Sequence, residues 1–195
     1  MGCDIHFKAY LYDKNSDDYV DIDIINQKLD KDNQLPELVG NRYYDLFGLF
    51  GNDIRSRFPF LEGLTEGYPA FFEEKDPEDA KCEDWYGYTH INPIVLKDSL
   101  KKYQNMMNTG NIFLLNNDEE VAEIEKRIYY KKEKWHGYSK PFSAVDSLSN
   151  EIDRIVKSID SYYKISKLAK FKMICDLAGY DFDIDKTEFI FWFDN

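Results

Sequence analysis

The sequence predicts an α+β fold in which a small, mainly antiparallel sheet is built from the first and last segments. Residues 3–12 alternate between apolar and polar side chains, which is the two-residue period of a half-buried strand. Residues 187–194 are aromatic and β-branched with almost no polar interruption, as is typical of a central strand buried on both faces. Residues 143–178 repeat apolar side chains at three- and four-residue intervals, which predicts one long or broken helix.

The first strand is expected to pair with its successor as a hairpin. A polar cluster at residues 13–18 has the composition of a turn, and residues 19–24 alternate again. The alternation divides the first strand into an apolar face and a polar face. The apolar face carries Cys3, Ile5, Phe7, Ala9 and Leu11, and the polar face carries Asp4, His6, Lys8, Tyr10 and Tyr12. Tyr10 and Tyr12 suggest that a helix or loop partly covers the polar face.

The middle of the chain is predicted to be more irregular. Residues 41–51 place aromatic and aliphatic side chains at helical spacing and end in Gly51, which predicts a short helix. Residues 52–93 are rich in glycine, proline and aromatic residues and are expected to form a long loop region. A helix is predicted from Pro93 to about Gly110. In residues 117–135 acidic side chains come first and basic ones last, which complements a helix dipole.

At 195 residues the chain fits a single domain, 1–195. We expect its sheet core to come from residues 1–25 and 186–195. The helical segment of about 117–180 is expected to pack against that sheet as a lobe.

Charge and cysteine content exclude several classes of function. The net charge of −12 disfavours direct DNA binding and binding to anionic membranes. Three widely spaced cysteines argue against a disulfide framework and for a reducing compartment. No apolar run approaches the roughly 20 residues that span a bilayer, and the start does not read as a signal peptide. The expected location is therefore the cytoplasm, without a membrane partner.

Three short segments carry a resemblance to a known family. The opening Met-Gly-Cys-Asp-Ile-His at residues 1–6, the Arg-Tyr-Tyr-Asp-Leu-Phe-Gly at 42–48 with Arg55, and the terminal Phe-Trp-Phe-Asp-Asn at 191–195 resemble uncharacterised bacteriophage and prophage proteins that begin with the same hexapeptide. Residues 85–91 look like the family's His-containing middle segment, which adds His90. The resemblance implies a phage or mobile-element origin and the host cytoplasm as location. Accessory proteins of this kind commonly act on host antiviral defences.

Two groups of polar residues are candidates for a binding site. Asp4 and His6 are two apart on a strand and so project from one face, close enough to share a ligand. The alternative is that Asp4 simply orients a buried His6. Arg42 and Arg55 flank an aromatic helix that contains Tyr44, which is suitable for holding an anion beside a ring. The alternative here is pairing of the arginines with nearby acids.

The leading hypothesis is a phage-encoded accessory protein that inhibits a host process, antiviral defence above all, by binding rather than catalysis. Its ligand would be a small nucleotide-like molecule or a host protein, with no cofactor and no assigned catalytic residue. The expected ligand-binding residues are Asp4, His6, Arg42, Tyr44, Arg55 and His90.

Two other functions stay open on the sequence. A metal-dependent phosphoester hydrolase would use Asp4, His6 and His90 as metal ligands. An acidic protein–protein inhibitor or nucleic-acid mimic would use residues 73–84, seven of which are acidic. Such acidic stretches more commonly serve as solvated loops.

Overall fold

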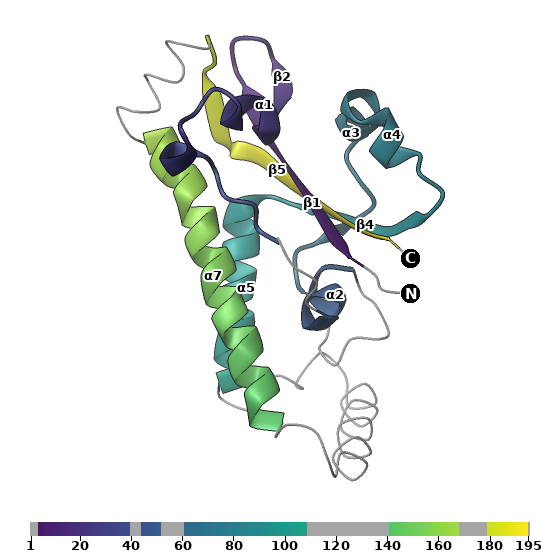
Figure 1. Ribbon diagram of the computed structural model, residues 1–195, viewed down its shortest axis with the longest axis vertical. Helices are drawn as coiled ribbons and strands as arrows, with labels where there is room; N and C mark the ends of the chain where they lie inside the picture. Colours follow the sequence, from purple (N-terminus) through teal and green to yellow (C-terminus); the bar gives the residue numbers. More distant parts are fainter. Residues whose placement is uncertain (1–3, 40–43, 52–60, 109–140, 168–178, 195) are drawn as a thin grey trace.

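A computed structural model describes residues 4–39, 44–51, 61–108, 141–167 and 179–194. The predicted α+β class is confirmed: five strands form one open antiparallel sheet in the order β2-β1-β5-β4-β3, with helices packed against it (Figure 1). The strands are β1 (Ile5–Asp13), β2 (Asp18–Asp21), β3 (Thr65–Glu66), β4 (Trp85–Ile91) and β5 (Phe182–Asp194). The helices are α1 (Ile22–Asn26), η1 (Lys31–Asn33), α2 (Tyr44–Gly51), α3 (Ala70–Lys75), α4 (Pro77–Ala80), α5 (Pro93–Asn108) and α7 (Pro141–Lys167).

The last strand lies at the centre of the sheet, as its continuous hydrophobicity predicts. β5 pairs with β1 on one side and β4 on the other, and Phe189, Ile190, Phe191, Trp192 and Phe193 are all buried. Both faces of β5 are therefore covered, which explains why this segment lacks the polar alternation of β1.

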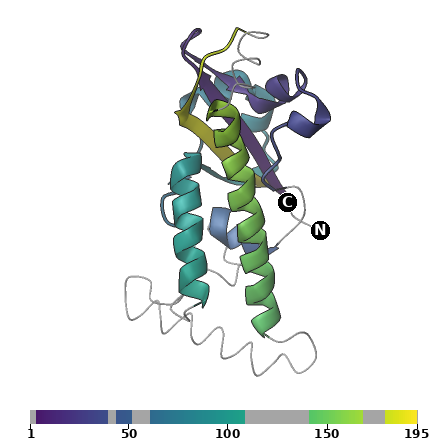
Figure 2. The same ribbon diagram turned by 90° about the vertical axis from the view of Figure 1, so that its left-hand side faces the viewer.

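The main core lies between one face of the sheet and the long helices α5 and α7. Figures 1 and 2 show these two helices side by side, running beyond the end of the sheet. The apolar series predicted for the long helix is buried in α7: Leu148, Ile152, Ile155, Ile159 and Tyr162. The remainder of the predicted 117–180 lobe, residues 117–140 and 168–178, lies outside the described residues, as does Cys3.

Two local predictions are wrong. Residues 22–24 begin helix α1 instead of continuing the second strand, because the Asp21 carboxylate accepts a hydrogen bond from the backbone N–H of Asp23 (2.8 Å) and caps the helix. Residues 52–93 are not one long loop, because they contain β3, α3, α4 and β4.

The missed strand β4 is hidden in the sequence by an irregular register. Its pairing with β5 shifts between Tyr86 and Thr89, and Gly87 between them has a positive φ of 64°. This bulge places Trp85 and Tyr88 on the same face although they are three residues apart, since both rings contact Trp192. The two-residue alternation that identifies a strand is broken at that point.

Candidate functional site

The second face of the sheet, opposite α5 and α7, carries the titratable and aromatic residues. We call it the aromatic face. It is covered in part by α3 and α4, which confirms the expectation that a helix or loop partly covers the polar side of β1. Its residues are His6, Lys8 and Tyr10 of β1, Glu188, Ile190 and Trp192 of β5, and Trp85, Tyr88 and His90 of β4.

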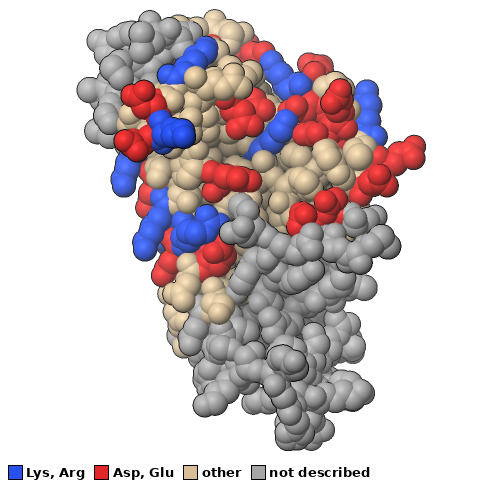
Figure 3. All heavy atoms as spheres, viewed as in Figure 1, with Lys and Arg blue, Asp and Glu red and all other residues tan. Residues whose placement is uncertain are grey.

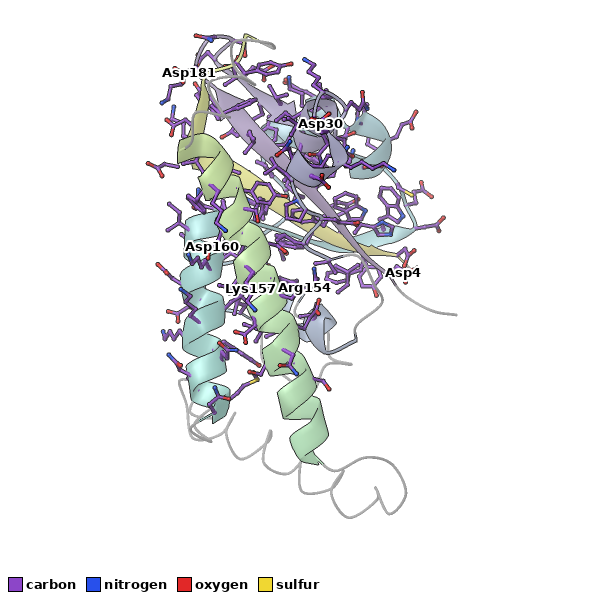
Figure 4. All side chains as sticks on the ribbon, turned by 60° about the vertical axis from the view of Figure 1, so that its left-hand side comes forward. Asp4, Asp30, Arg154, Lys157, Asp160 and Asp181 are labelled. Carbon is purple, nitrogen blue, oxygen red and sulfur yellow. The ribbon has the colours of Figure 1, made fainter. Side chains whose placement is uncertain are left out.

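His6 and His90 reach this face of the sheet from two different strands, β1 and β4. His6 is opposite Trp192 in the β1–β5 register, whereas His90 is opposite Ile190 in the β4–β5 register. The two histidines therefore share a face but lie on strands that β5 separates. Asp4 directly precedes β1, at the opposite end of the sheet from Asp181, as Figure 4 shows.

The other predicted ligand-binding residues contribute less to the described structure. Tyr44 is the first residue of α2, and α2 is tied to the sheet by the Thr89 hydroxyl, which donates to the carbonyl of Phe50 (2.6 Å). Arg42 and Arg55 lie outside the described residues. The predicted site is thus seen only through Asp4, His6, His90 and the backbone of Tyr44.

His6 lies in a cluster of three rings at one end of the aromatic face, in which each ring centroid is 5.2–5.5 Å from the other two. Its imidazole centroid is 5.2 Å from the ring of Trp85 and 5.5 Å from that of Trp192, with interplanar angles of 28° and 12°. The cluster forms because Trp192 is the register partner of His6, and Trp85 lies on the next strand, β4. Trp192 is buried, whereas His6 and Trp85 are partly exposed.

The carboxylate beside His6 belongs to Asp194. His6 Nε2 is 3.4 Å from Asp194 Oδ2, which is the range of an ion pair. The backbone N–H of Asp4 donates to Asp194 Oδ1, and the backbone N–H of Asp194 donates to the carbonyl of Asp4 (3.3 Å). Asp4 therefore helps to hold the Asp194 carboxylate in place through its backbone. The contact that the sequence pattern predicts, between the Asp4 side chain and His6, stays a prediction.

Lys8 is the centre of an ion-pair cluster beneath the short helices. Its Nζ lies 2.7 Å from Asp76 Oδ1, 3.1 Å from Asp79 Oδ2 and 3.7 Å from Asp21 Oδ2. Burial lowers the pKa of Lys8, but the hydrogen bonds and charges of Asp76 and Asp79 outweigh it and leave the pKa above its ordinary value. For Asp21 burial is the larger influence and raises the pKa of the carboxyl despite the nearby ammonium. Lys8 thus clamps α4 onto the sheet.

His90 of the aromatic face also has a carboxylate partner. His90 Nδ1 is 3.2 Å from Glu188 Oε2. Tyr88, beside it on β4, donates its hydroxyl to the carbonyl of Asp79 (2.5 Å), and burial raises the pKa of this phenol to about 12. Tyr88 is therefore a neutral hydrogen-bond donor at any physiological pH.

The acidic stretch 73–84 is partly structural and partly exposed. Asp76 and Asp79 turn inward to Lys8, and Lys75 pairs with Asp18 of β2. The exposed carboxylates are those of Glu73, Glu74, Glu78, Glu83 and Asp84. Figure 3 shows acidic side chains gathered over α3, α4 and the turn into β4. The stretch thus contains the end of α3, the whole of α4 and the turn into β4, with an acidic outer surface.

Within the described part of the chain, no three histidine, cysteine, aspartate or glutamate side chains gather closely enough to hold a metal ion. The described helices include none with the length and apolarity needed to cross a membrane.

Comparison of the chain with protein-family models, with curated proteins and with solved structures gave no match.

The sequence patterns missed the residues that surround His6 and Lys8. Alternation along β1 places Lys8 on the same face as His6, and this was visible in the sequence. Trp85, Trp192 and Asp194 were visible only as parts of segments, because their proximity to His6 depends on the pairing of β5 with β1 and β4.

Proposed function

We propose that this protein is a phage-encoded accessory protein that inhibits a host process, antiviral defence above all, by binding a host protein. The phage origin rests on the resemblance of residues 1–6, 42–48 and 191–195 to phage and prophage proteins. The mode of action rests on the aromatic face. One observation carries it: His6 and Trp85 are partly exposed above the buried Trp192 at the end of the sheet, beside the carboxylate of Asp194.

The charges of the aromatic face favour binding over catalysis. Lys8 is held by Asp76 and Asp79, and His90 is held by Glu188. Lys8 and His90 each have a carboxylate partner inside the chain, so both groups stabilise the fold through their pairing. A partly exposed tryptophan next to acidic residues is suited to a protein interface, because tryptophan is strongly enriched among the residues that dominate binding affinity.

A nucleotide-like ligand is the second candidate, favoured by the same stacked rings, on which a base could lie. At this end of the sheet the carboxylates of Asp194, Glu83 and Asp84 would repel a phosphate. A nucleotide would therefore need Arg42 and Arg55 to hold its phosphate. Isothermal titration with cyclic and ADP-ribose-type nucleotides separates the two candidates. Heat of binding that disappears in an Arg55→Ala variant would favour the nucleotide.

The proposal is tested by phage infection of bacteria that carry a defence system and express this protein. We expect expression to raise the number of plaques in defence-carrying cells and to leave it unchanged in cells without the system. A Trp85→Ala variant is expected to lose the effect. Lys157→Ala, an exposed change on α7 away from the aromatic face, is expected to keep it (Figure 4). Unchanged plaque numbers across a panel of defence systems would reject the proposed function.

A further inference from the structure

The outer end of the aromatic face combines an indole surface with a fixed carboxylate. Trp85 is the register partner of Asp194, so the indole and the carboxylate come from neighbouring positions on adjacent strands. Trp85 is also stacked on His6 and 5.5 Å from the ring of Trp192, which holds the indole in one orientation. The Asp194 carboxylate is held by the backbone N–H of Asp4, lies 3.4 Å from His6 Nε2 through its other oxygen and remains 29% exposed. Both groups are therefore positioned before any partner arrives.

The surroundings of this end of the face are acidic. Glu83 and Asp84 immediately precede Trp85 and are exposed, and Glu78 is exposed on α4. The basic side chains of the adjoining elements are already paired: Lys8 with Asp76 and Asp79, and Lys81 with Glu73 (3.1 Å). In a chain with a net charge of −12, this surface attracts cations and repels phosphate and nucleic acid.

We propose that Trp85 and Asp194 form the docking point for an arginine side chain on a basic segment of the host partner. A guanidinium is planar and weakly hydrated, so it stacks on an indole while donating hydrogen bonds to a carboxylate beside the ring. A lysine ammonium would gain the charge attraction but not the stacking. The exposed acids Glu78, Glu83 and Asp84 extend the attraction beyond one side chain, which matches a basic protein segment better than a small cation. This inference rests on the proposed function as a host-protein binder.

The test uses the full chain and four peptides of equal length, rich in arginine, lysine, glutamine or glutamate. Affinities are measured by isothermal titration, and the indole N–H signals of the protein's three tryptophans are followed by NMR, with a Trp85→Phe variant identifying the Trp85 signal. We expect the arginine peptide to bind most tightly and to shift the Trp85 signal. Binding should weaken strongly between about 0.1 M and about 1 M salt, because the Debye length falls from about 10 Å to about 3 Å.

Three variants divide the contributions of ring and charge. Trp85→Ala is expected to weaken binding of the arginine peptide about 30-fold, as for a tryptophan that dominates an interface. Asp194→Asn keeps an oxygen for the Asp4 N–H and removes the charge, and should weaken the same binding about tenfold. Lys157→Ala on α7 should leave it unchanged. If Trp85→Ala does not fold, Trp85→Phe should still lower the preference for arginine over lysine, because a phenyl ring attracts cations less than an indole does.

Equal binding of the arginine and glutamine peptides, or an unmoved Trp85 signal, would overturn the docking point. If plaque numbers in defence-carrying cells still rise, that result removes this inference alone and leaves the proposed function standing. Peptide binding at Trp85 without a rise in plaque numbers would support the arginine docking point and reject inhibition of defence.

Discussion

Replacing Lys8 by methionine is expected to destabilise the fold more than the loss of any single exposed ion pair does. The substitution keeps a long apolar stem and removes the one ammonium that partly offsets the charges of Asp21, Asp76 and Asp79. Those three carboxylates then face one another beneath α4. Their side chains are only 17–22% exposed, and Lys8 itself is 21% exposed, so water screens the repulsion poorly.

The size of the effect follows from that partial burial. Exposed ion pairs contribute about 0.2–1 kcal/mol, whereas removing one partner of a buried pair costs about 3–5 kcal/mol. Lys8 lies between these limits, and we expect Lys8→Met to lower the free energy of unfolding by about 2–3 kcal/mol. For a chain of this length, that corresponds to a fall in Tm of about 4–12 °C.

The pH dependence of this loss has a defined sign. The pKa of Lys8 is raised in the folded state, so its contribution is complete below the unfolded value of 10.5 and is lost as pH rises through the folded value. In acid, protonation of the Asp21 carboxyl, whose pKa burial raises, removes part of the repulsion left in the variant. The difference between wild type and Lys8→Met should therefore be largest near neutral pH and shrink at both extremes.

Urea unfolding at several pH values measures the difference, with Lys75→Met as the matched control. Lys75 anchors α3 through Asp18, but the two side chains are 32% and 48% exposed, so its loss should cost less than about 1 kcal/mol. Equal destabilisation by the two substitutions, or a Lys8→Met effect that does not change with pH, would refute the assignment of Lys8 as the clamp of the aromatic face.

Three further predictions concern stability. The Asp13 carboxylate accepts hydrogen bonds from three backbone N–H groups and one hydroxyl, so Asp13→Ala should cost about 2–3 kcal/mol in urea unfolding. Burial raises the pKa of Asp13, but those hydrogen bonds outweigh it and hold the pKa below 3.8. The stability lost in Asp13→Ala should therefore be complete above pH 3.8 and shrink as the pH falls through the pKa of Asp13 in the folded state. Gly87→Ala should lower Tm more than Gly67→Ala. Both glycines have a positive φ, but only at Gly87 would the added Cβ lie 2.9 Å from the Phe193 ring. Equal losses of Tm would show that backbone strain alone determines the cost. Trp192→Phe should lower the free energy of unfolding by less than about 1.5 kcal/mol, since the buried indole N–H has no hydrogen-bond partner among the described residues. Trp192→Ala should lower it by about 3–5 kcal/mol. A large loss of stability in the phenylalanine variant would contradict this reasoning.

The periodic elements of the fold were predictable because their cause is local. Alternation in residues 5–11 fixes which side chains of β1 face the core, and the helical spacing from Leu148 to Tyr162 fixes the buried face of α7. The aromatic run 189–193 requires cover on both sides, which only a central strand provides.

The elements that escaped prediction are those in which tertiary contacts override the local pattern. The bulge at Gly87 interrupts the alternation of β4, and close packing against Phe193 requires the absence of a side chain there. The acidic stretch 73–84 reads as a solvated loop until Lys8, more than sixty residues earlier, is placed beneath Asp76 and Asp79.

The sequence by itself determined that His6 and Lys8 lie on one face of the first strand, opposite the core. Only the tertiary structure decided what surrounds them, because Trp85, Trp192 and Asp194 reach His6 through the register of three strands that are distant along the chain. Register is set by ladder hydrogen bonds and by packing on both faces of the sheet, and neither is encoded in any single segment.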